Sequence, residues 1–266
     1  MVFSTRSFTY SKGKFTSLQS ELILEAPIEI IINNDRSVLI MYTPEMTREL
    51  VTGFVFTDGL IGDLSDIKEC IISSTDKGHG ALLVQARVSI SGNSSGLSEL
   101  KGKRVSYSSC GICGKEAYLD LETGLGRVKS RHRFSMEVIL SLPERITSCQ
   151  PLYHRTGGAH AAVLLDEKGN PLIHCEDMGR HNAVDKVIGA SLIQQISLGD
   201  KMLLSSGRAS LEMILKMARA GIPLFVVMSR PTSRAVEAAK FYNITLVDIA
   251  KESNRIYSHA RRIEGF

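Results

Sequence analysis

The C-terminal half of the chain alternates short apolar segments with amphipathic ones, and this rhythm limits the possible folds more than any other feature. Five apolar segments are predicted strands: 159–166, 171–176, 202–205, 224–229 and 244–249. Three amphipathic segments of helical period lie between the later strands: 182–196, 210–220 and 233–241. Strands that alternate with helices at this spacing favour a largely parallel sheet. We therefore expect an α/β fold whose mostly parallel sheet carries helices on both faces.

The first hundred residues predict a smaller α+β body with the element order ββαββ. Its first two strands form a hairpin, with a strand over 21–33, a turn at 33–35 and a second strand over 37–42. The last two strands of this body are expected near 67–73 and 81–90.

The helix of the smaller body is predicted from its start signals. Thr43 supplies a hydroxyl for the N-cap, and Pro44 stands at the first helical position. Apolar residues then recur at helical spacing until Gly59, so we expect the helix to end there.

Composition places a boundary between the two bodies. The serine- and glycine-rich segment 91–96 is typical of a linker, and a short strand is predicted at 104–107 after it. We therefore expect a small α+β domain over residues 1–103 and an α/β domain over residues 104–266.

Charge and hydropathy narrow the functional classes. Lys and Arg number 32 against 28 Asp and Glu, and the net charge of +4 favours a local anion site over a histone-like partner. The longest apolar run, Ile222 to Met228, is much shorter than the roughly 18–20 residues that a membrane span needs. The first twenty residues lack the apolar core of a secretory signal. We expect a cytoplasmic protein with no nucleic-acid or membrane partner.

Three loops at predicted strand ends each combine an arginine with small or hydroxyl residues: EDMGRHN (176–182), SSGRAS (205–210) and SRPTSR (229–234). Ligands of open α/β sheets bind at this edge, where loops lead into helix N-termini. Backbone N–H groups, the helix dipole and an arginine fork all favour phosphate there. A fourth loop, HRTGGAH (154–160), has two glycines that allow close backbone approach and two histidines. The loops together predict a ligand with more than one phosphate.

Each of these features also has a simpler interpretation. A single Gly-Arg pair before a helix is most often a cap with a solvated side chain. Asp177 could be a general acid or base, or a carboxylate that caps its loop, and His181 could be catalytic or only a satisfied polar residue. The basic stretch RVKSRHRF (127–134) could bind an acidic partner or form a solvated face.

The five cysteines include one closely spaced pair, Cys110 and Cys113, in the segment SSCGICGK. The odd number and irregular spacing do not indicate a disulfide framework. The pair could belong to a zinc site, a thioredoxin-type redox centre or a nucleophilic, sulfur-carrying thiol, or it could be inert. Zinc would need two more ligands, whereas the glycines and Lys115 suit an accessible thiolate. The other three cysteines lack a motif and are expected to be buried: Cys70, Cys149 and Cys175.

The segments SSCGICGK, TGGAHAAVL, EDMGRHNAVDKVIG and SGRASLEM, in this order, resemble the formate dehydrogenase accessory sulfurtransferases. The similarity extends from about Glu21 to Ile263. It implies a dimeric cytoplasmic protein with a cytidine-deaminase-like fold in the larger domain. It further implies a carrier that takes persulfide sulfur from a cysteine desulfurase and transfers it to a molybdenum or tungsten bis-molybdopterin guanine dinucleotide. Formate dehydrogenase needs this cofactor in sulfurated form; GDP would be a fragment ligand, and no structural metal is implied.

The resemblance also assigns residues. Cys110 corresponds to the persulfide-bearing cysteine and Cys113 to its partner. The implied cofactor-binding residues lie in the loops: Gly157, Gly158, His160, Asp177, Gly179, Arg180, His181, Asn182, Ser206, Gly207, Arg208, Ser210 and Thr232. A further group follows the last core strand: Ile249, Ala250, Lys251, Glu252, Ser253 and Asn254. This segment keeps the family's Lys251 but lacks its two glycines and gains Glu252, so we expect an altered cofactor affinity or client dehydrogenase.

Two other functions remain open. The H-x-E…P-C-x-x-C zinc signature of deaminases is absent, so deamination is not expected. A non-catalytic chaperone would bind the cofactor without using its thiols. A zinc-dependent hydrolase would contain stoichiometric zinc.

Overall fold

The structure, a computed structural model, describes residues 1–76, 82–91, 105–107, 125–250 and 254–266. The elements of the first part are β1 (Val2–Ser11), β2 (Lys14–Ile23), β3 (Ala26–Ile32), β4 (Arg36–Tyr42), α1 (Thr47–Thr57), η1 (Leu64–Asp66), β5 (Ile67–Asp76), β6 (Leu82–Ile90) and β7 (Val105–Tyr107). The second part contains α3 (Met136–Thr147), α4 (Pro151–Thr156), β8 (His160–Leu165), β9 (Pro171–Asp177), α5 (Arg180–Ile193), β10 (Met202–Arg208), α6 (Leu211–Ala220), β11 (Leu224–Ser229), α7 (Ser233–Phe241), β12 (Thr245–Asp248), β13 (Arg255–Ser258) and η2 (Ala260–Arg262).

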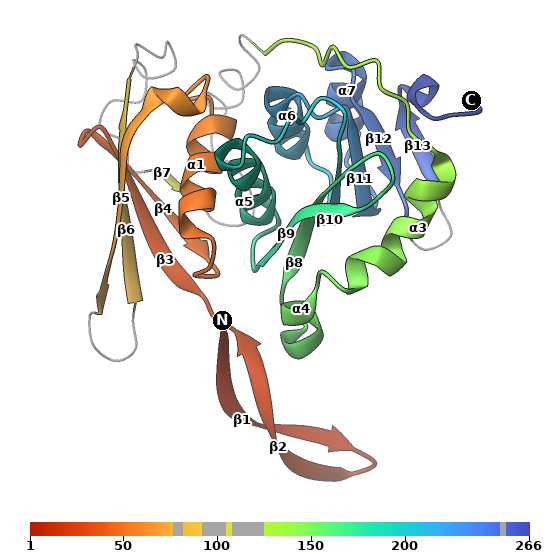
Figure 1. The fold of residues 1–266 in the computed structure, drawn as a ribbon. Coiled ribbons are helices and arrows are strands. Elements are labelled where there is room, and N and C mark those ends of the chain that lie inside the picture. The colour runs from red at the N-terminus through yellow and green to blue at the C-terminus, as the bar shows by residue number, and fades with distance from the viewer. Residues whose placement is uncertain (77–81, 92–104, 108–124, 251–253) are drawn as a thin grey trace.

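The strands of the described residues form three sheets (Figure 1). The first is the two-stranded pair β1–β2. The second has the order β5-β6-β3-β4-β7, and the third has the order β13-β12-β11-β10-β8-β9. The ββαββ order and the β3–β4 hairpin expected from the sequence are both present. The chain is therefore a mixed α/β protein with two main sheets.

The strand expected over 21–33 is in fact two strands in different sheets. β2 ends at Ile23, and β3 begins at Ala26 after a two-residue break. β1 and β2 pair only with each other and project from the body as an arm (Figure 1). Polar residues occupy much of this hairpin, so apolar periodicity gave no sign of it.

The helix start expected at Thr43 is also wrong. α1 begins at Thr47 after an N-cap at Met46, whose φ of 49° is left-handed. Thr43 does not cap α1 because it has other partners: its backbone N–H donates to Asp177 at 3.1 Å, and its hydroxyl accepts from the Met178 N–H at 3.2 Å. Tertiary contacts have outweighed a local capping signal here.

The short strand expected to open the larger domain belongs to the sheet of the smaller part. β7 runs parallel to β4, with Tyr107 opposite Ile40. The division into domains 1–103 and 104–266 stays a prediction, but the strand pairing crosses it.

The expectation of a mostly parallel sheet is wrong. β11 is parallel to both β10 and β12, whereas the β10–β8, β8–β9 and β12–β13 pairs are antiparallel. β8 and β9 form a hairpin, joined by a turn near Gly169 with φ 77°, and a hairpin is antiparallel by construction. The sheet is therefore mixed, and the likeness to the cytidine deaminase fold stays a prediction.

Both faces of the six-stranded sheet are covered, as expected. Successive residues in a strand point to opposite faces. Leu164 of β8 and Phe225 of β11 pack on one side with α5, α6 and α7. Their neighbours Val163 and Val226 pack on the other side with α3.

No helix among the described residues is long and apolar enough to cross a membrane.

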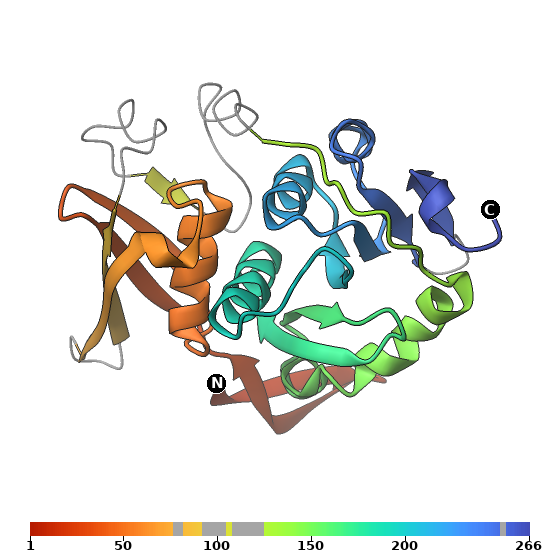
Figure 2. The same cartoon turned by 45° about the horizontal axis from the view of Figure 1, so that its top comes forward.

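The two parts meet where α1 packs against α5 (Figure 2). The crossing point is glycine against glycine: a Cβ added at Gly53 would overlap the carbonyl oxygen of Asp185, and one added at Gly189 would overlap that of Glu49. The helices therefore approach to backbone contact. Residues of both parts belong to one continuous hydrophobic core.

Candidate functional site

Strand pairing brings the arginine-bearing loops to one edge of the six-stranded sheet. β8 is antiparallel to its neighbours, so its first residue, His160, lies opposite Asp177 at the end of β9. Arg208 at the end of β10 lies opposite Ser229 at the end of β11. We call this edge, formed by residues 157–160, 177–182, 206–210, 229–232 and 249–250, the loop edge. The expected convergence of the loops is confirmed.

Two helices begin at the loop edge without side-chain caps. The N-cap of α5 is Gly179 and that of α6 is Ser210, and neither makes a side-chain capping bond. By contrast, the Thr232 hydroxyl accepts from the N–H of Ala235 at 3.2 Å and caps α7. The first N–H groups of a helix have no partner inside the helix. α5 and α6 therefore offer N–H groups and the positive ends of two helix dipoles to an anion.

Arg180 is held across the loop edge by a glycine. A Cβ added at Gly207 would lie only 2.9 Å from Cδ of Arg180, so the side chain occupies the space that Gly207 leaves. Among the described residues, Nε of Arg180 is buried and has no hydrogen-bond partner. Arg208, on the next loop, is exposed. Together with the exposed Arg230, these two arginines supply the positive charge of the edge.

Two histidines flank these arginines, and burial keeps both rings neutral. Nδ1 of His160 lies 3.3 Å from the Ser206 hydroxyl, which also accepts from the Ala161 N–H at 2.9 Å. Burial, followed by the charge of Arg180, lowers the pKa of His160. The rings can therefore act as hydrogen-bonding groups without adding charge.

His181 is the more strongly perturbed histidine. Its Nε2 lies 3.3 Å from a Glu212 carboxylate oxygen and 3.4 Å from the Ser210 hydroxyl. Burial, with the charges of Lys216 and Arg180, nevertheless lowers the pKa of His181 to about 3. Because burial and the two cations outweigh the opposing charge of Asp185, the ring is neutral at pH 7. A neutral ring is a weak candidate for a general acid.

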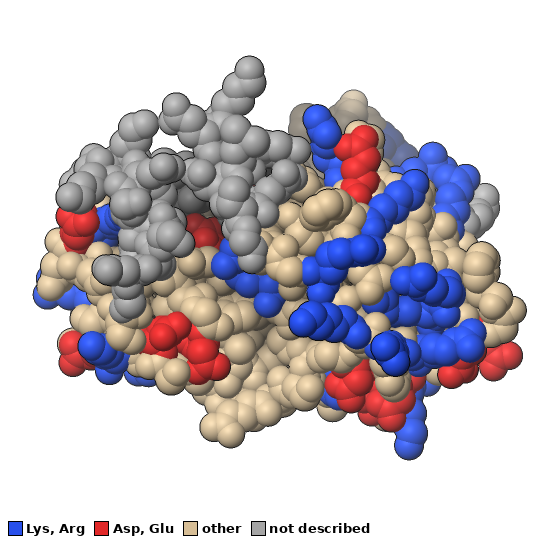
Figure 3. Space-filling view, turned by 90° about the horizontal axis from the view of Figure 1, so that it is seen from above, with Lys and Arg blue, Asp and Glu red and all other residues tan. Residues whose placement is uncertain are grey.

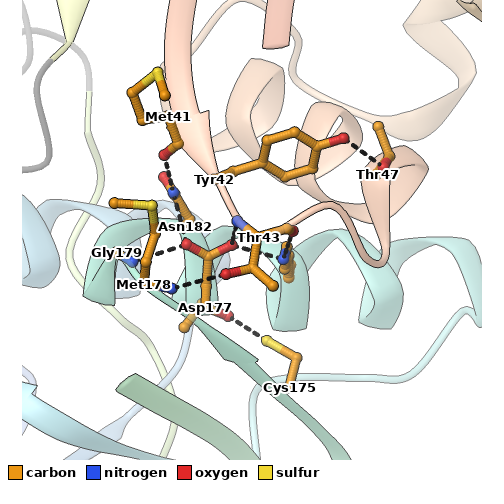
Figure 4. A network of polar contacts seen from close by, with 11 residues as sticks. Met41, Tyr42, Thr43, Thr47, Cys175, Asp177, Met178, Gly179 and Asn182 are labelled. Carbon is orange, nitrogen blue, oxygen red and sulfur yellow. Dashed lines mark hydrogen bonds and ion pairs between the residues drawn. The ribbon is translucent and has the colours of Figure 1, made fainter. Parts of the chain in front are cut away.

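Asp177 is fully buried, and all its observed partners are protein groups (Figure 4). Oδ1 accepts from the Gly179 N–H at 2.8 Å and from Nδ2 of Asn182 at 2.9 Å. Oδ2 accepts from Nζ of Lys186 at 2.6 Å and from the Thr43 N–H at 3.1 Å. This geometry favours the loop-capping interpretation over an acid/base role.

Asn182 and Lys186 extend the same contacts into the first part of the chain. Nδ2 of Asn182 donates to the carbonyl oxygen of Met41 at 2.9 Å, and Nζ of Lys186 donates to that of Thr43 at 2.9 Å. Asn182 is therefore directed toward the N-terminal part (Figure 4). As cofactor-binding residues, Asp177 and Asn182 stay predictions that their contacts do not favour.

A second buried pair, which the sequence reasoning missed, uses Asp185, the residue of α5 directly before Lys186. Nζ of Lys216 donates to both carboxylate oxygens of Asp185, at 2.8 and 2.9 Å, and to the Thr57 hydroxyl at 2.9 Å. We call the two pairs, Asp177–Lys186 and Asp185–Lys216, together with Thr43 and Thr57, the seam. The Asp-Lys end of the EDMGRHNAVDK motif could have predicted this pair. Adjacent charged residues on a helix that is expected to be buried need partners of opposite charge.

The remaining predicted residues are spread along the loop edge. Gly157 caps α4 with φ 67°, and a Cβ at Gly158 would lie 3.3 Å from Ile23 of β2. Ala250 donates its N–H to Asp248 at 2.6 Å. Ile249 is buried and Asn254 is exposed with φ 35°. Five predicted site residues lie outside the described residues: Cys110, Cys113, Lys251, Glu252 and Ser253.

The cysteines that lack a motif are largely inaccessible. Cys149 and Cys175 are buried as expected, whereas Cys70 is half-buried. Sγ of Cys175 donates to the carbonyl oxygen of Ala183 at 3.1 Å, and burial raises the pKa of this thiol. Among the described residues no group of three or more His, Cys, Asp or Glu side chains could hold a metal ion.

The fold and the loop edge together define a mixed α/β protein with two main sheets, in which two helix N-termini without side-chain caps lie at one sheet edge. Comparison with known proteins gives the family. The chain belongs to the FdhD/NarQ family, whose model matches residues 23–264. This confirms the resemblance seen in the sequence.

Curated relatives cover nearly the whole chain. The protein named sulfur carrier protein FdhD of Thermoplasma acidophilum is 36% identical over 97% of this chain and 93% of its own length. The protein of the same name from Mycolicibacterium paratuberculosis is 36% identical over 98% of this chain and 99% of its own. A crystal structure from Desulfotalea psychrophila, described as a formate dehydrogenase accessory protein, matches with a TM-score of 0.74 at 23% identity, covering 98% and 99% of the two chains. At that identity the match supports the fold alone.

Proposed function

We propose that this protein is a sulfur carrier in the maturation of formate dehydrogenase. In this role it receives persulfide sulfur from a cysteine desulfurase and delivers it to a bis-molybdopterin guanine dinucleotide cofactor of molybdenum or tungsten, which is its substrate. The names of the relatives support the carrier role. The single structural observation that carries the proposal is the pair of uncapped helix N-termini beside Arg180 and Arg208 at the loop edge.

The loop edge has the donors that a guanine dinucleotide needs. Its phosphates would accept hydrogen bonds from the N–H groups that begin α5 and α6, with the guanidinium groups of Arg180 and Arg208 alongside. Nε of Arg180, which has no hydrogen-bond partner among the described residues, supplies a further donor. His160 and His181, both neutral, would add hydrogen bonds without adding positive charge.

The sulfur chemistry would use Cys110 and Cys113. The Cys110 thiolate attacks the outer sulfur of the desulfurase persulfide, forming an S–S bond on Cys110 while the donor cysteine leaves as a thiolate. The Cys113 thiolate then attacks the inner sulfur and releases hydrosulfide, and a Cys110–Cys113 disulfide remains. The two cysteines supply the two electrons that reduce the carried sulfur to sulfide. A cellular thiol reductant restores the pair.

Sulfur loading tests the carrier role. The protein is incubated with a cysteine desulfurase and ³⁵S-labelled cysteine, and protein-bound label that a thiol reductant releases is counted. Cys110→Ala should abolish the label, whereas Cys149→Ala is a matched control that should keep it. Label that persists in both Cys110→Ala and Cys113→Ala would refute the proposal. If a double cysteine variant still restored dehydrogenase activity in a deletion strain, the non-catalytic chaperone would replace it.

Guanine nucleotide binding tests the loop edge. GDP should raise the melting temperature, because a ligand that binds only the native state stabilises it. Arg180→Ala and Arg208→Ala should each reduce this shift, and Lys14→Ala, an exposed cation of the β1–β2 hairpin, serves as the control. An equal shift in all four proteins would remove both arginines from the site.

Measurements of mass in solution, with and without GDP, would test the homodimer that the resemblance implies.

A further inference from the structure

A basic cavity lies at the edge of the six-stranded sheet opposite the loop edge. It has a volume of about 590 Å³, and its lining residues are Lys129, Ser130, Arg131, Arg133, Asn243, Arg261, Arg262 and Phe266. Asn243 lies two residues before β12, whereas the loop edge contains the residues that follow β12, so the length of the strand separates the two places. Figure 2 shows the chain before α3 passing α6 and α7 to reach this end of the sheet.

Backbone contacts fix the walls of the cavity. Phe134 and Ile263 form a parallel bridge, and the N–H of Phe134 donates to the carbonyl oxygen of Arg262 at 2.8 Å. Nδ2 of Asn243 donates to the carbonyl oxygen of Val128 at 2.6 Å. The cavity therefore has walls from three segments that are far apart in sequence but tied together.

The lining of the cavity contains several cationic side chains and no acidic one. Five of its lining residues are cationic: Lys129, Arg131, Arg133, Arg261 and Arg262. In the part of the chain that the structure describes, none of the five forms an ion pair. In Figure 3 lysine and arginine side chains gather on the side of this face away from the grey residues. A concave surface lined by one sign of charge concentrates ligands of the opposite sign.

Arg262 is a buried and fixed part of the cavity lining. It is only 4% exposed, and its two terminal nitrogens donate to the Thr245 hydroxyl at 3.3 Å and to the carbonyl oxygen of Ser130 at 3.2 Å. Its Nε is buried and lacks a partner among the described residues. A buried guanidinium with an unused donor is costly unless an acceptor comes from outside.

We infer that this cavity is a second anion site, which binds a small molecule with two or more phosphate groups. Five cations in one hollow exceed what a single carboxylate would balance. The volume is in the range of about 300–1,000 Å³ that small-molecule sites occupy, and a folded partner would contact a wider and flatter surface. The guanidinium forks of Arg131 and Arg261 are exposed and match phosphate oxygens in geometry.

The experiment titrates the full-length protein with sodium pyrophosphate by calorimetry at 150 mM salt. The test protein is the Arg131→Ala/Arg261→Ala double variant; both positions are exposed, and circular dichroism checks that its fold is unchanged. Each guanidinium should contribute at least about tenfold to affinity, as hydrogen bonds to charged groups do, so binding should weaken by about 100-fold or more. Lys14→Ala, at the exposed tip of the arm, is the control for loss of charge alone.

The result is kept separate from that of the loop edge by a third variant. Arg208→Ala should retain the pyrophosphate affinity of this cavity, whatever happens to GDP binding at the loop edge. Equal affinity in the wild type and the double variant would overturn the inference. So would a poly-glutamate peptide that binds at the same residues more tightly than pyrophosphate, because the cavity would then serve an acidic protein segment.

Discussion

The first turns of α5 present two contrasting surfaces. Toward the N-terminal part, the seam buries Asp177, Asp185 and Lys186 with every charge paired. Toward the loop edge, Arg180 and His181 begin α5, whose N-terminus has no side-chain cap, and Nε of Arg180 has no partner among the described residues. The two surfaces alternate within a single motif of eleven residues, EDMGRHNAVDK.

This difference shows how the residues of such a motif can be separated into those that stabilise the fold and those that can bind a ligand. A charged residue that the protein already satisfies from several directions is committed to the fold. A charged residue with unused donors at an edge is available to a ligand. The motif therefore joins the two parts of the molecule through most of its members and exposes only a few to chemistry.

Removing one member of a seam pair should have the largest effect. Asp177→Ala leaves Lys186 charged and buried, and breaking such a pair costs about 3–5 kcal/mol of unfolding free energy. Denaturant unfolding measures this loss. If Asp177→Ala unfolded like the wild type but lost its GDP-induced shift, Asp177 would belong to the ligand site and the contrast would fail.

The helix crossing beside the seam should come next. Gly189→Ala would put a methyl group against the carbonyl oxygen of Glu49, and overpacking of this kind costs about 1–3 kcal/mol. Gly199→Ala is the matched control, because a Cβ there meets nothing within 4 Å. A melting temperature that fell equally in both variants would show that loss of glycine, and not the crossing, is responsible.

His181 gives a smaller effect that depends on pH. Its pKa is about 3 in the folded protein and near 6.5 when unfolded, so the unfolded state takes up the proton first as the pH falls. The stabilisation is complete above about pH 6.5 and declines by about 1.4 kcal/mol per pH unit below it. Burial raises the pKa of Asp58 to about 6, which has the opposite effect on stability.

The difference between the wild type and His181→Asn therefore isolates the histidine. Unfolding free energies at pH 7 and pH 5 should show about 2 kcal/mol more acid destabilisation in the wild type than in the variant. Parallel pH curves for the two proteins would mean that His181 is not held in the neutral form by its surroundings.

Arg208→Ala should have the smallest effect on the fold. Its side chain is exposed, and exposed substitutions usually change the unfolding free energy by no more than about 0.5 kcal/mol. The same variant should lose much of the GDP-induced shift in melting temperature. A large loss of stability would place Arg208 with the seam residues instead.

Periodicity predicted most elements of the fold, but not how they pair. The strands 159–166 and 171–176 were located correctly, yet their hairpin made the sheet mixed, because direction depends on the connection and not on the apolar pattern. The β1–β2 arm escaped prediction because it has no buried face to impose alternation. Local signals fail where the stabilising contact is tertiary or absent.

The candidate site divides in the same way. The convergence of the loops could be predicted, since carboxyl ends of neighbouring strands meet at one edge. The inward direction of Asp177 and Asn182 could not be, because their partners Thr43 and Met41 lie more than a hundred residues earlier in the chain. Asp177 and His181 are both titratable residues of the same motif. Only the surrounding structure shows that Asp177 is held by protein groups, whereas His181 lies at the loop edge.

The glycine contact between α1 and α5 has a mechanical consequence. Two helices whose backbones touch cannot slide or rotate past one another without collision, and the seam residue Asp185 lies at that contact, because its carbonyl oxygen faces Gly53. The α1–α5 contact therefore couples the two main sheets, so a strain applied to one sheet is transmitted to the other. Binding at one sheet would be felt at the other as a change in stability and not as a change in the angle between them.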